Sequence, residues 1–447
     1  MKKAALHNLG CKVNAYETEA MQQMLENAGY EIVDFSDAAD VYVINTCSVT
    51  NMADRKSRQM LHRAKAKNPD AVVVAAGCYV QTKEEEVRVD DAVDIIIGNN
   101  KKGELVGLLE QYFAEKSKTD AQKEAPSCGN IEAVIDINDG NQEFEELFLS
   151  QTAEHTRAFI KVQDGCNQFC SYCVIPYARG RVRSRSLESV IKEVQGLAAK
   201  GFKEVVLTGI HLSSYGIDTN DSLLHLIQKV HEIPGIERIR LGSLEPRLVT
   251  EEFAAEIAKL PKICPHFHLS LQSGCDETLK RMNRKYTSKE YEEGCRLLRK
   301  YFEHPAITTD VIVGFPGETE SEFEATRAFL EHIHFYEMHI FKYSKRAGTR
   351  AAVMENQVPE EIKTTRSANL IELGERMSKE FREAYVGGIQ EVLFEEEVQM
   401  EHKTYFVGYN KEYVKIAVES DTDLSNRILS CEVLGCLKDE IYLGKLC

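Results

Sequence analysis

The first 115 residues alternate short apolar runs with longer amphipathic segments. The apolar runs that predict strands lie at 3–9, 41–46, 71–76 and 93–97. Amphipathic segments separate them, and the one at 17–28 has the spacing of a helix. Strands that alternate with helices are typical of a parallel sheet covered by helices. We therefore expect residues 1–115 to form one α/β domain.

The periodicity fades between residues 116 and 154, where we expect a linker with one strand. A second alternating series occupies 155–384. Its predicted strands lie at 158–163, 204–209, 238–243, 267–272, 308–313 and 337–342. Six strand–helix units predict a partial barrel of the (β/α)6 type, and in such barrels the chemistry sits at the carboxyl ends of the strands.

A long helix is predicted at 360–383, and a different pattern follows it. The tail at 385–447 has short alternating strands at 389–394, 405–408, 414–418, 428–433 and 440–444. Five short strands in so few residues predict a small β-barrel. The expected fold class is therefore α/β, with an amino-terminal parallel-sheet domain, a central partial (β/α)6 barrel and a small carboxy-terminal β-barrel.

Composition narrows the class of protein. The chain has 447 residues, of which 43% are hydrophobic and 28% charged, as in globular proteins of several domains. Neither a membrane-spanning apolar run nor a secretory signal is evident, so we expect a cytoplasmic protein with no membrane partner. The net charge of −16 argues against nonspecific coating of nucleic acid, although a local basic face is compatible with it. The 13 dispersed cysteines favour metal ligation or buried thiols over disulfides.

Three cysteines stand close together directly after the first predicted barrel strand, at Cys166, Cys170 and Cys173. Three thiolates can hold three irons of a four-iron cluster and leave the fourth iron open. An open iron can chelate the amino and carboxylate groups of a methionine moiety, as reductive cleavage of S-adenosylmethionine requires. Zinc is the main alternative, but it usually takes four ligands in two short pairs, and no second pair follows at that spacing. The run resembles the radical S-adenosylmethionine signature.

Three further cysteines, Cys11, Cys47 and Cys78, lie far apart, and each comes just past a predicted strand. The carboxyl ends of parallel strands share one edge of a sheet, so the three thiols can converge there. Gly10 and Gly77 would let the backbone approach a bulky inorganic group. A single cysteine at such a place is ordinarily a small buried residue. Three at equivalent positions favour a second three-thiolate cluster.

Polar residues and glycines end several of the predicted barrel strands. Glycine and proline after a strand are ordinary turn residues, but a shared place on one rim favours a nucleoside pocket. The residues that we expect to bind the cofactor S-adenosylmethionine are Tyr172, Gly209, Ser243, Glu245, Gln272 and Gly314.

Basic residues gather near the predicted site loops despite the acidic total. Arg181, Arg183 and Arg185 follow the cysteine triplet at a spacing of two, which places them on one face of an extended segment. Further basic runs lie at 55–67 and 280–285. A charge run is usually a solvated face, yet a phosphate-bearing substrate would need such a rim. We expect the three arginines to bind RNA phosphates.

Several segments together support a resemblance to a known family. The segments 9–14, 45–47 and 76–78, the cysteine triplet and the β-barrel tail resemble the methylthiotransferases over essentially the whole chain. Within the family, 10–14 and 175–181 look most like the branch that modifies N6-threonylcarbamoyladenosine beside the tRNA anticodon. The branches that act on isopentenyladenosine or on a ribosomal-protein aspartate look less similar.

The resemblance implies a mechanism with two [4Fe-4S] clusters, one on each cysteine triplet, so that all six cysteines are catalytic. One S-adenosylmethionine methylates a sulfur held at the first cluster. A second is cleaved to a deoxyadenosyl radical, which removes hydrogen from carbon 2 of the adenine, where the methylthio group is delivered. The implied partners are the tRNA anticodon arm, a reducing electron donor and a sulfur donor. The tail would be an RNA-contacting TRAM domain, although its net negative charge departs from that expectation.

One alternative belongs to a different class of protein. A two-cluster iron–sulfur protein that only transfers electrons would also need two cysteine triplets. It would not cleave S-adenosylmethionine, and it leaves the six-unit barrel with its polar rim unexplained.

Overall fold

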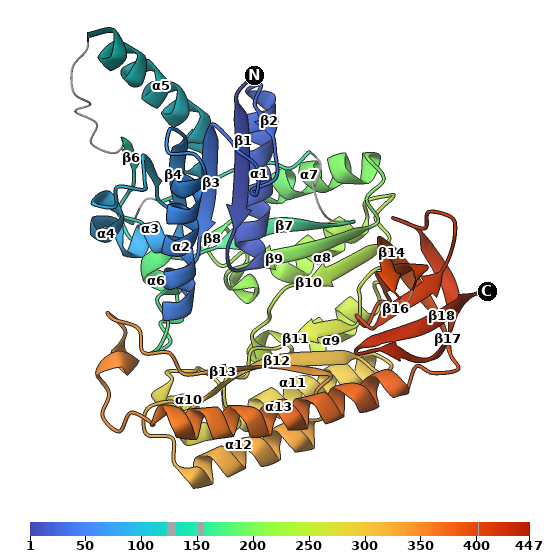
Figure 1. Cartoon of the computed structure of the whole chain (residues 1–447). Helices are drawn as coiled ribbons and strands as arrows, with labels where there is room; N and C mark the ends of the chain where they lie inside the picture. Colours follow the sequence, from blue (N-terminus) through green and yellow to red (C-terminus); the bar gives the residue numbers. More distant parts are fainter. Residues whose placement is uncertain (123–130, 141, 151–155, 401) are drawn as a thin grey trace.

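The chain folds into three adjoining parts, which Figure 1 shows in blue, in green to orange and in red. The computed structural model describes residues 1–122, 131–140, 142–150, 156–400 and 402–447. Part of the expected linker at 116–154 therefore lies outside the described residues. Among the described helices, none is both long enough and apolar enough to cross a membrane.

The amino-terminal part is a parallel sheet with the strand order β2-β1-β3-β4-β5-β6. Its strands are β1 Lys3–Asn8, β2 Glu31–Ile32, β3 Val41–Thr46, β4 Val72–Gly77, β5 Ile95–Ile97 and β6 Ile131–Ala133. Its helices are α1 Lys12–Asn27, α2 Asn51–Lys67, α3 Cys78–Thr82, α4 Glu84–Arg88 and α5 Leu105–Gln122. Every residue of β3 and β4 is buried, as expected for parallel strands that are covered on both faces. The four predicted strands all form, and two short edge strands join them.

The central part contains six parallel strands that follow one another in space in chain order. They are β7 Arg157–Asp164, β9 Glu204–Gly209, β10 Arg238–Leu241, β11 His266–His268, β12 Ala306–Val313 and β13 Glu337–Lys342. Two bridges, between residues 239 and 263 and between residues 244 and 269, join the sheet that ends at β10 to the sheet that begins at β11. The sheet does not close, so the predicted partial barrel is confirmed. A short strand, β8 Arg183–Ser184, pairs antiparallel with the end of β7.

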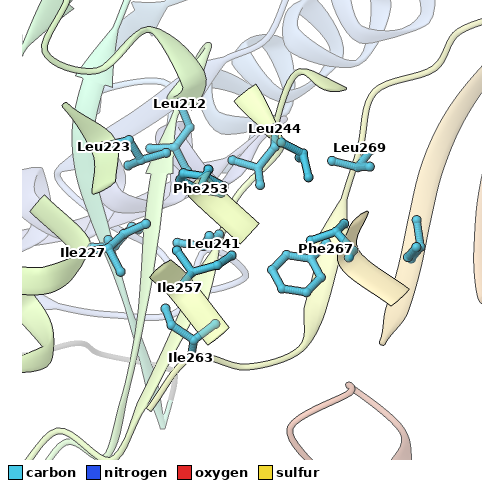
Figure 2. Packing of buried hydrophobic residues seen from close by; sticks show 14 of the residues in the cluster. Leu212, Leu223, Ile227, Leu241, Leu244, Phe253, Ile257, Ile263, Phe267 and Leu269 are labelled. Atoms are coloured by element: carbon cyan, nitrogen blue, oxygen red, sulfur yellow. The ribbon is translucent and has the colours of Figure 1, made fainter. Parts of the chain in front are cut away.

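Helices cover the outer face of this half-barrel. They are α7 Leu187–Ala199, α8 Leu223–His231, α9 Glu251–Ala258, α10 Asp276–Arg281, α11 Ser288–Tyr301, α12 Glu320–Ile333 and α13 Glu360–Glu383. Figure 2 shows how their apolar faces meet the strands: Ile227 of α8 and Ile257 of α9 lie against Leu241 of β10. Phe267 of β11 continues the same core and is fully buried. This packing holds the strand ends, and with them the site loops, in fixed positions.

The tail forms a closed barrel in the order β14-β15-β16-β18-β17, as predicted. Its strands are β14 Ile389–Met400, β15 Lys403–Tyr409, β16 Lys415–Glu419, β17 Ile428–Lys438 and β18 Ile441–Leu446. The barrel docks against the start of β10, where Arg238 donates hydrogen bonds to the carbonyls of Tyr409 (2.9 Å) and Glu391 (2.7 Å).

Candidate active site

The carboxyl ends of three neighbouring strands bring Cys11, Cys47 and Cys78 together. Cys11 caps the start of α1, Cys47 follows β3 directly, and Cys78 begins α3 after β4. Gly10 has a left-handed φ of +107°, and a Cβ at this position would lie 2.9 Å from the sulfur of Cys47. A side chain there would therefore strain the backbone and press on the thiol. The convergence that strand placement predicts is present in the structure.

Hydrogen-bond donors surround this first triplet. Arg179 donates its Nε–H to the Cys78 sulfur over 3.3 Å, and the amide of Asn99 reaches the same sulfur over 3.5 Å. Burial raises the pKa of Cys47 to about 11 and also raises the pKa of Cys11. Cys47 and Cys11 therefore keep their protons at neutral pH unless a metal replaces them. Three convergent thiols with cationic and amide donors are a donor set that fits an iron–sulfur cluster.

Arg179 ties the first triplet to the barrel. It is fully buried and follows α6 (Ile175–Ala178), the short helix after the second triplet. Besides the Cys78 sulfur, its guanidinium reaches Asn14 Oδ1 (2.5 Å), Glu17 Oε1 (2.8 Å) and Asp164 (3.2 Å). One side chain of the barrel thus contacts both a ligand candidate and a helix of the amino-terminal sheet domain.

Glu17 is the acidic centre of this buried network. Its carboxylate also accepts hydrogen bonds or ion pairs from Lys161 (2.7 Å) and Lys102 (3.1 Å). Burial by itself would raise the pKa of Glu17, but the three cations hold it well below its usual range. The network therefore fixes how the two triplets are placed relative to each other.

The second triplet occupies the loop between β7 and α6. Backbone N–H groups of Gln168 and Ile175 point at the sulfurs of Cys166 and Cys173, each over 3.5 Å. Arg284 donates to the Cys170 sulfur over 3.2 Å. Burial raises the pKa of Cys166 to about 11 and that of Cys173 to about 12. The described residues near this loop supply no fourth cysteine ligand, so the donor set fits a four-iron cluster with one open iron better than a zinc site.

A cavity opens beside this triplet. It is lined by Cys166, Gln168, Cys170, Tyr172, Cys173, Ile175, Ile210, His211, Ser243, Leu244, Glu245, Ser270, Gln272 and Arg284. Four of the six residues predicted to bind cofactor are among them: Tyr172, Ser243, Glu245 and Gln272. The cavity therefore combines the candidate cluster ligands with polar groups from the ends of several barrel strands.

The other two predicted cofactor residues do not line this cavity. A Cβ at Gly209 would lie 2.8 Å from Oε1 of Gln163, and one at Gly314 would lie 2.3 Å from Cγ of Lys363. These glycines make room for neighbouring side chains of the protein. The turn pattern after a strand cannot distinguish that packing role from contact with a ligand.

Glu245 is held as an anion at the cavity wall. It accepts hydrogen bonds from Arg247 (2.7 Å) and Gln168 (3.2 Å), and His211 lies 3.4 Å away. Burial would raise the pKa of Glu245, but its partners His211 and Arg247 outweigh burial and lower the pKa to about 2. Opposite it, Gln272 has a left-handed φ of 73°, fixed by backbone hydrogen bonds to β12 on both sides. Such strain in a side chain other than glycine is typical of functional sites.

The three arginines predicted to bind RNA separate into two groups. Arg181 is exposed, and its guanidinium lies 4.5 Å from the centre of the Phe169 ring. Arg183 donates to the carbonyl of Arg179 (2.9 Å), while Arg185 is fully buried and pairs with Glu193 and Glu146. The pairing of β8 with β7 turns both side chains inward. Their burial corrects the prediction for Arg183 and Arg185 and leaves Arg181 as a candidate phosphate contact.

Sequence reasoning missed several residues of the site. The sequence did not indicate Gln168 or His211, because neither belongs to a motif whose spacing predicts ligand binding or catalysis. Arg284 stood in a basic run that we interpreted as RNA-facing, yet it contacts the Cys170 sulfur. Glu17 is a charged residue on the buried face of α1, and this unusual placement is the one feature that could have indicated its role.

Comparisons with known proteins agree with both halves of this site. Residues 160–330 match the model of the Radical SAM superfamily, and residues 3–98 match an uncharacterised protein family, UPF0004. The chain is 42% identical to threonylcarbamoyladenosine tRNA methylthiotransferase MtaB of Bacillus subtilis, over 97% of this chain and 94% of that protein. It is also 42% identical to the protein of the same name in Aquifex aeolicus, over 90% and 95% of the two chains.

A relative that is named for a different modified adenosine is less similar to this chain. The tRNA-2-methylthio-N(6)-dimethylallyladenosine synthase of Acetivibrio thermocellus is 36% identical, over 97% of this chain and 88% of its own. Among solved structures, the radical S-adenosylmethionine methyltransferase TsrM from Kitasatospora setae matches with a TM-score of 0.52 and 16% identity. That match covers 79% of this chain and 77% of the other, and at this identity it shows a shared fold.

Proposed function

The chain belongs to the tRNA methylthiotransferase family of radical S-adenosylmethionine enzymes, and we propose that it adds a methylthio group to carbon 2 of N6-threonylcarbamoyladenosine next to the tRNA anticodon. The observation that supports this best is the position of Arg179, which follows the second triplet in the chain and donates a hydrogen bond to the Cys78 sulfur of the first triplet. A sulfur group held at the first triplet and S-adenosylmethionine held at the second would then both lie next to the target adenine of the tRNA. The higher identity to the threonylcarbamoyladenosine enzymes than to the dimethylallyladenosine synthase supports the choice of base.

We assign the cavity at the second triplet to S-adenosylmethionine and one [4Fe-4S] cluster. When bound, a cluster with an open iron supplies the electron that cleaves S-adenosylmethionine. The chain's own residues bind and orient the cofactor. The Glu245 carboxylate can accept hydrogen bonds from an amino group or from ribose hydroxyls, and Ser243 and Gln272 offer further polar contacts from neighbouring strand ends.

The first triplet would hold a second [4Fe-4S] cluster, on Cys11, Cys47 and Cys78. Its place in the amino-terminal sheet domain, outside the barrel, supports a role in sulfur transfer. Arg179 and Asn99 would donate hydrogen bonds toward the ligand sulfur of Cys78. Glu17 and Asp164 position Arg179 for that contact.

The reaction also defines the partners that we propose. The tRNA anticodon arm is the substrate, an electron donor reduces the barrel cluster, and a sulfur donor supplies the transferred atom. Arg181, exposed beside the second triplet, would contact a tRNA phosphate. The target base must leave its stack to reach the cavity, which suits a nucleotide in a loop. These partners place the reaction in the cytoplasm.

Each of the three parts of the chain would have its own role in the reaction. We propose that residues 1–115 form the sulfur-transfer domain, 155–384 the radical barrel and 385–447 a TRAM-like domain, with 116–154 as the connecting segment.

A reconstituted reaction tests the proposal. Purified protein, loaded with iron and sulfide without oxygen, is mixed with S-adenosylmethionine, a reductant and tRNA that carries threonylcarbamoyladenosine. Nucleoside mass analysis should then detect the 2-methylthio derivative. The same reaction on tRNA that carries dimethylallyladenosine serves as the control, and a product from that tRNA alone would contradict the choice of base.

A further inference from the structure

A group of polar side chains lies inside the half-barrel, below the cavity at the second triplet. His268 of β11, Asp310 of β12 and His339 of β13 come from three adjacent parallel strands, and their ligand atoms lie within 4.8 Å of one another. His268 Nε2 is 3.2 Å from Asp310 Oδ2. Ser270, two residues beyond His268, and Gln272, whose N–H bonds to the carbonyl of Asp310, line the cavity above. The group is thus one layer of side chains deeper in the barrel than the cavity residues.

Lys12 reaches the same interior from the amino-terminal sheet domain. It is the first residue of α1, which packs against β7 and β9, and it directly follows Cys11 of the first triplet. Its charge acts on both His266 and His339. Its side chain is exposed, and no carboxylate pairs with it among the residues that the structure describes. Lys12 is therefore an accessible cation directly beside the first triplet, without a carboxylate partner in the described part of the chain.

The surrounding charges decide which ligand fits. Burial, and after it the like charges of Arg240 and Arg157, lower the pKa of Lys12 to about 8, so Lys12 stays mostly charged at neutral pH. Each of these arginines already has an acidic partner, since Arg240 donates a hydrogen bond to Glu204 over 2.8 Å and Arg157 pairs with Glu395 over 2.8 Å. Three cations therefore face these two acids. A divalent cation on the two histidines and Asp310 would be repelled by these positive groups. A carboxylate would be attracted by them and would pair with Lys12. The interior therefore favours a ligand that carries one negative charge and further polar atoms.

The two modified bases that the relatives' names give differ in this property. A threonylcarbamoyl group carries a carboxylate, a hydroxyl and urea N–H groups, whereas a dimethylallyl group is a hydrocarbon. We infer that Lys12, at the start of α1, binds the carboxylate of the threonylcarbamoyl group and so determines which modified adenosine this protein accepts. Asp310 and the two histidines supply hydrogen-bonding partners for the hydroxyl and urea atoms. This inference rests on the proposed function, because it names the part of the same substrate that the barrel interior recognises.

The test uses two synthetic anticodon stem–loops that differ only in one charge. One carries threonylcarbamoyladenosine, and in the other the threonine carboxylate is replaced by its neutral carboxamide. Binding of both RNAs, and KM and kcat for both, are measured with the reconstituted wild-type protein and three variants. Lys12→Gln removes the charge, Lys12→Arg keeps it, and Lys200→Gln removes an exposed charge beyond the end of α7.

We expect the wild-type protein to bind the acid about 10- to 100-fold more tightly than the amide, as for hydrogen bonds to charged groups. Lys12→Gln should abolish this ratio through KM, while Lys12→Arg and Lys200→Gln should retain most of it. Because both RNAs meet the same preparation, any loss of clusters or folded protein cancels in the ratio. A ratio near one in the wild type, or an unchanged ratio in Lys12→Gln, overturns the inference.

Two further outcomes separate this inference from its alternatives. A stoichiometric divalent ion beyond the cluster irons, lost on changing His339→Ala, would overturn it in favour of a metal site. A wild-type protein that prefers the acid yet forms no methylthio product would contradict the proposed function while supporting the carboxylate site.

Discussion

Changing Glu17→Gln removes a negative charge that three buried cations share. In the structure, Glu17 is fully buried and contacts Arg179, Lys161 and Lys102 at 2.7 to 3.1 Å. Glutamine has nearly the same shape, so it tests the charge while keeping the packing. After the change, Asp164 still pairs with Arg179 and Lys161.

The expected cost follows from this geometry. Removing one partner of a buried ion pair costs about 3–5 kcal/mol, because the charges left behind remain desolvated. At about 2–4 °C per kcal/mol for a domain of 150–250 residues, that corresponds to a fall in melting temperature on the order of 6–20 °C. Glu26→Gln on the same helix is the matched control. Glu26 is only partly buried and accepts a hydrogen bond from Gln22, so its loss should cost less than about 1 kcal/mol.

The effect should also depend on pH in a defined direction. The folded protein holds the pKa of Glu17 well below its ordinary value of 4.5. The stabilisation is therefore complete above about pH 4.5 and is lost as the pH falls below that value. Thermal unfolding of the two variants and the wild type, at neutral pH and at a series of lower pH values, measures this. Equal melting temperatures for Glu17→Gln and Glu26→Gln, or a difference that grows on acidification, would refute the reasoning.

Three other predictions concern the clusters and the RNA. Changing all three of Cys166, Cys170 and Cys173 to alanine should remove about half of the iron from anaerobically reconstituted protein, as measured by metal analysis; retention of all iron would count against two clusters. Alanine at Cys11, Cys47 and Cys78 should leave reductive cleavage of S-adenosylmethionine intact but abolish the methylthio product, and loss of cleavage in folded protein would contradict this division of labour. Arg181→Ala should weaken tRNA binding and lower the salt dependence by about one unit of log–log slope, whereas the buried Arg185→Ala should instead lower the melting temperature. An Arg181→Ala variant with unchanged affinity and slope would exclude the phosphate contact.

The sequence alone predicted most of the fold because each part has its own hydrophobic period. The four longer strands of the amino-terminal sheet, the six strands of the half-barrel and the five of the tail barrel all formed. The edge strand β2 was not predicted, because two residues cannot show a period. The one strand expected within 116–154 is β6, whose three residues were too few to locate from the sequence. Strand placement also predicted the convergence of Cys11 with Cys47 and Cys78, since parallel strand ends share an edge.

Other features depend on contacts between segments that are far apart in the sequence, and a local pattern of residues cannot predict such contacts. We expected Arg185, with Arg181 and Arg183, to bind RNA phosphates, yet burial by β8 and the amino-terminal sheet domain places both Arg179 and Arg185 in structural ion pairs. Gly209 and Gly314 matched the pattern of a ligand-binding turn, but Gln163 and Lys363 occupy the space beside them. His211 gained its place in the cavity wall only when the loops after β9 and β10 came together in the folded barrel.

The most direct test of the central claim is mass analysis of tRNA nucleosides from cells that have the gene, from cells that lack it, and from deleted cells given back either the wild-type protein or the Cys166→Ala variant. The account predicts 2-methylthio-N6-threonylcarbamoyladenosine in the first, its replacement by unmethylthiolated threonylcarbamoyladenosine in the second, and restoration by the wild-type protein alone. Unchanged levels of the methylthio nucleoside after deletion, in cells with no second enzyme of this family, would contradict it.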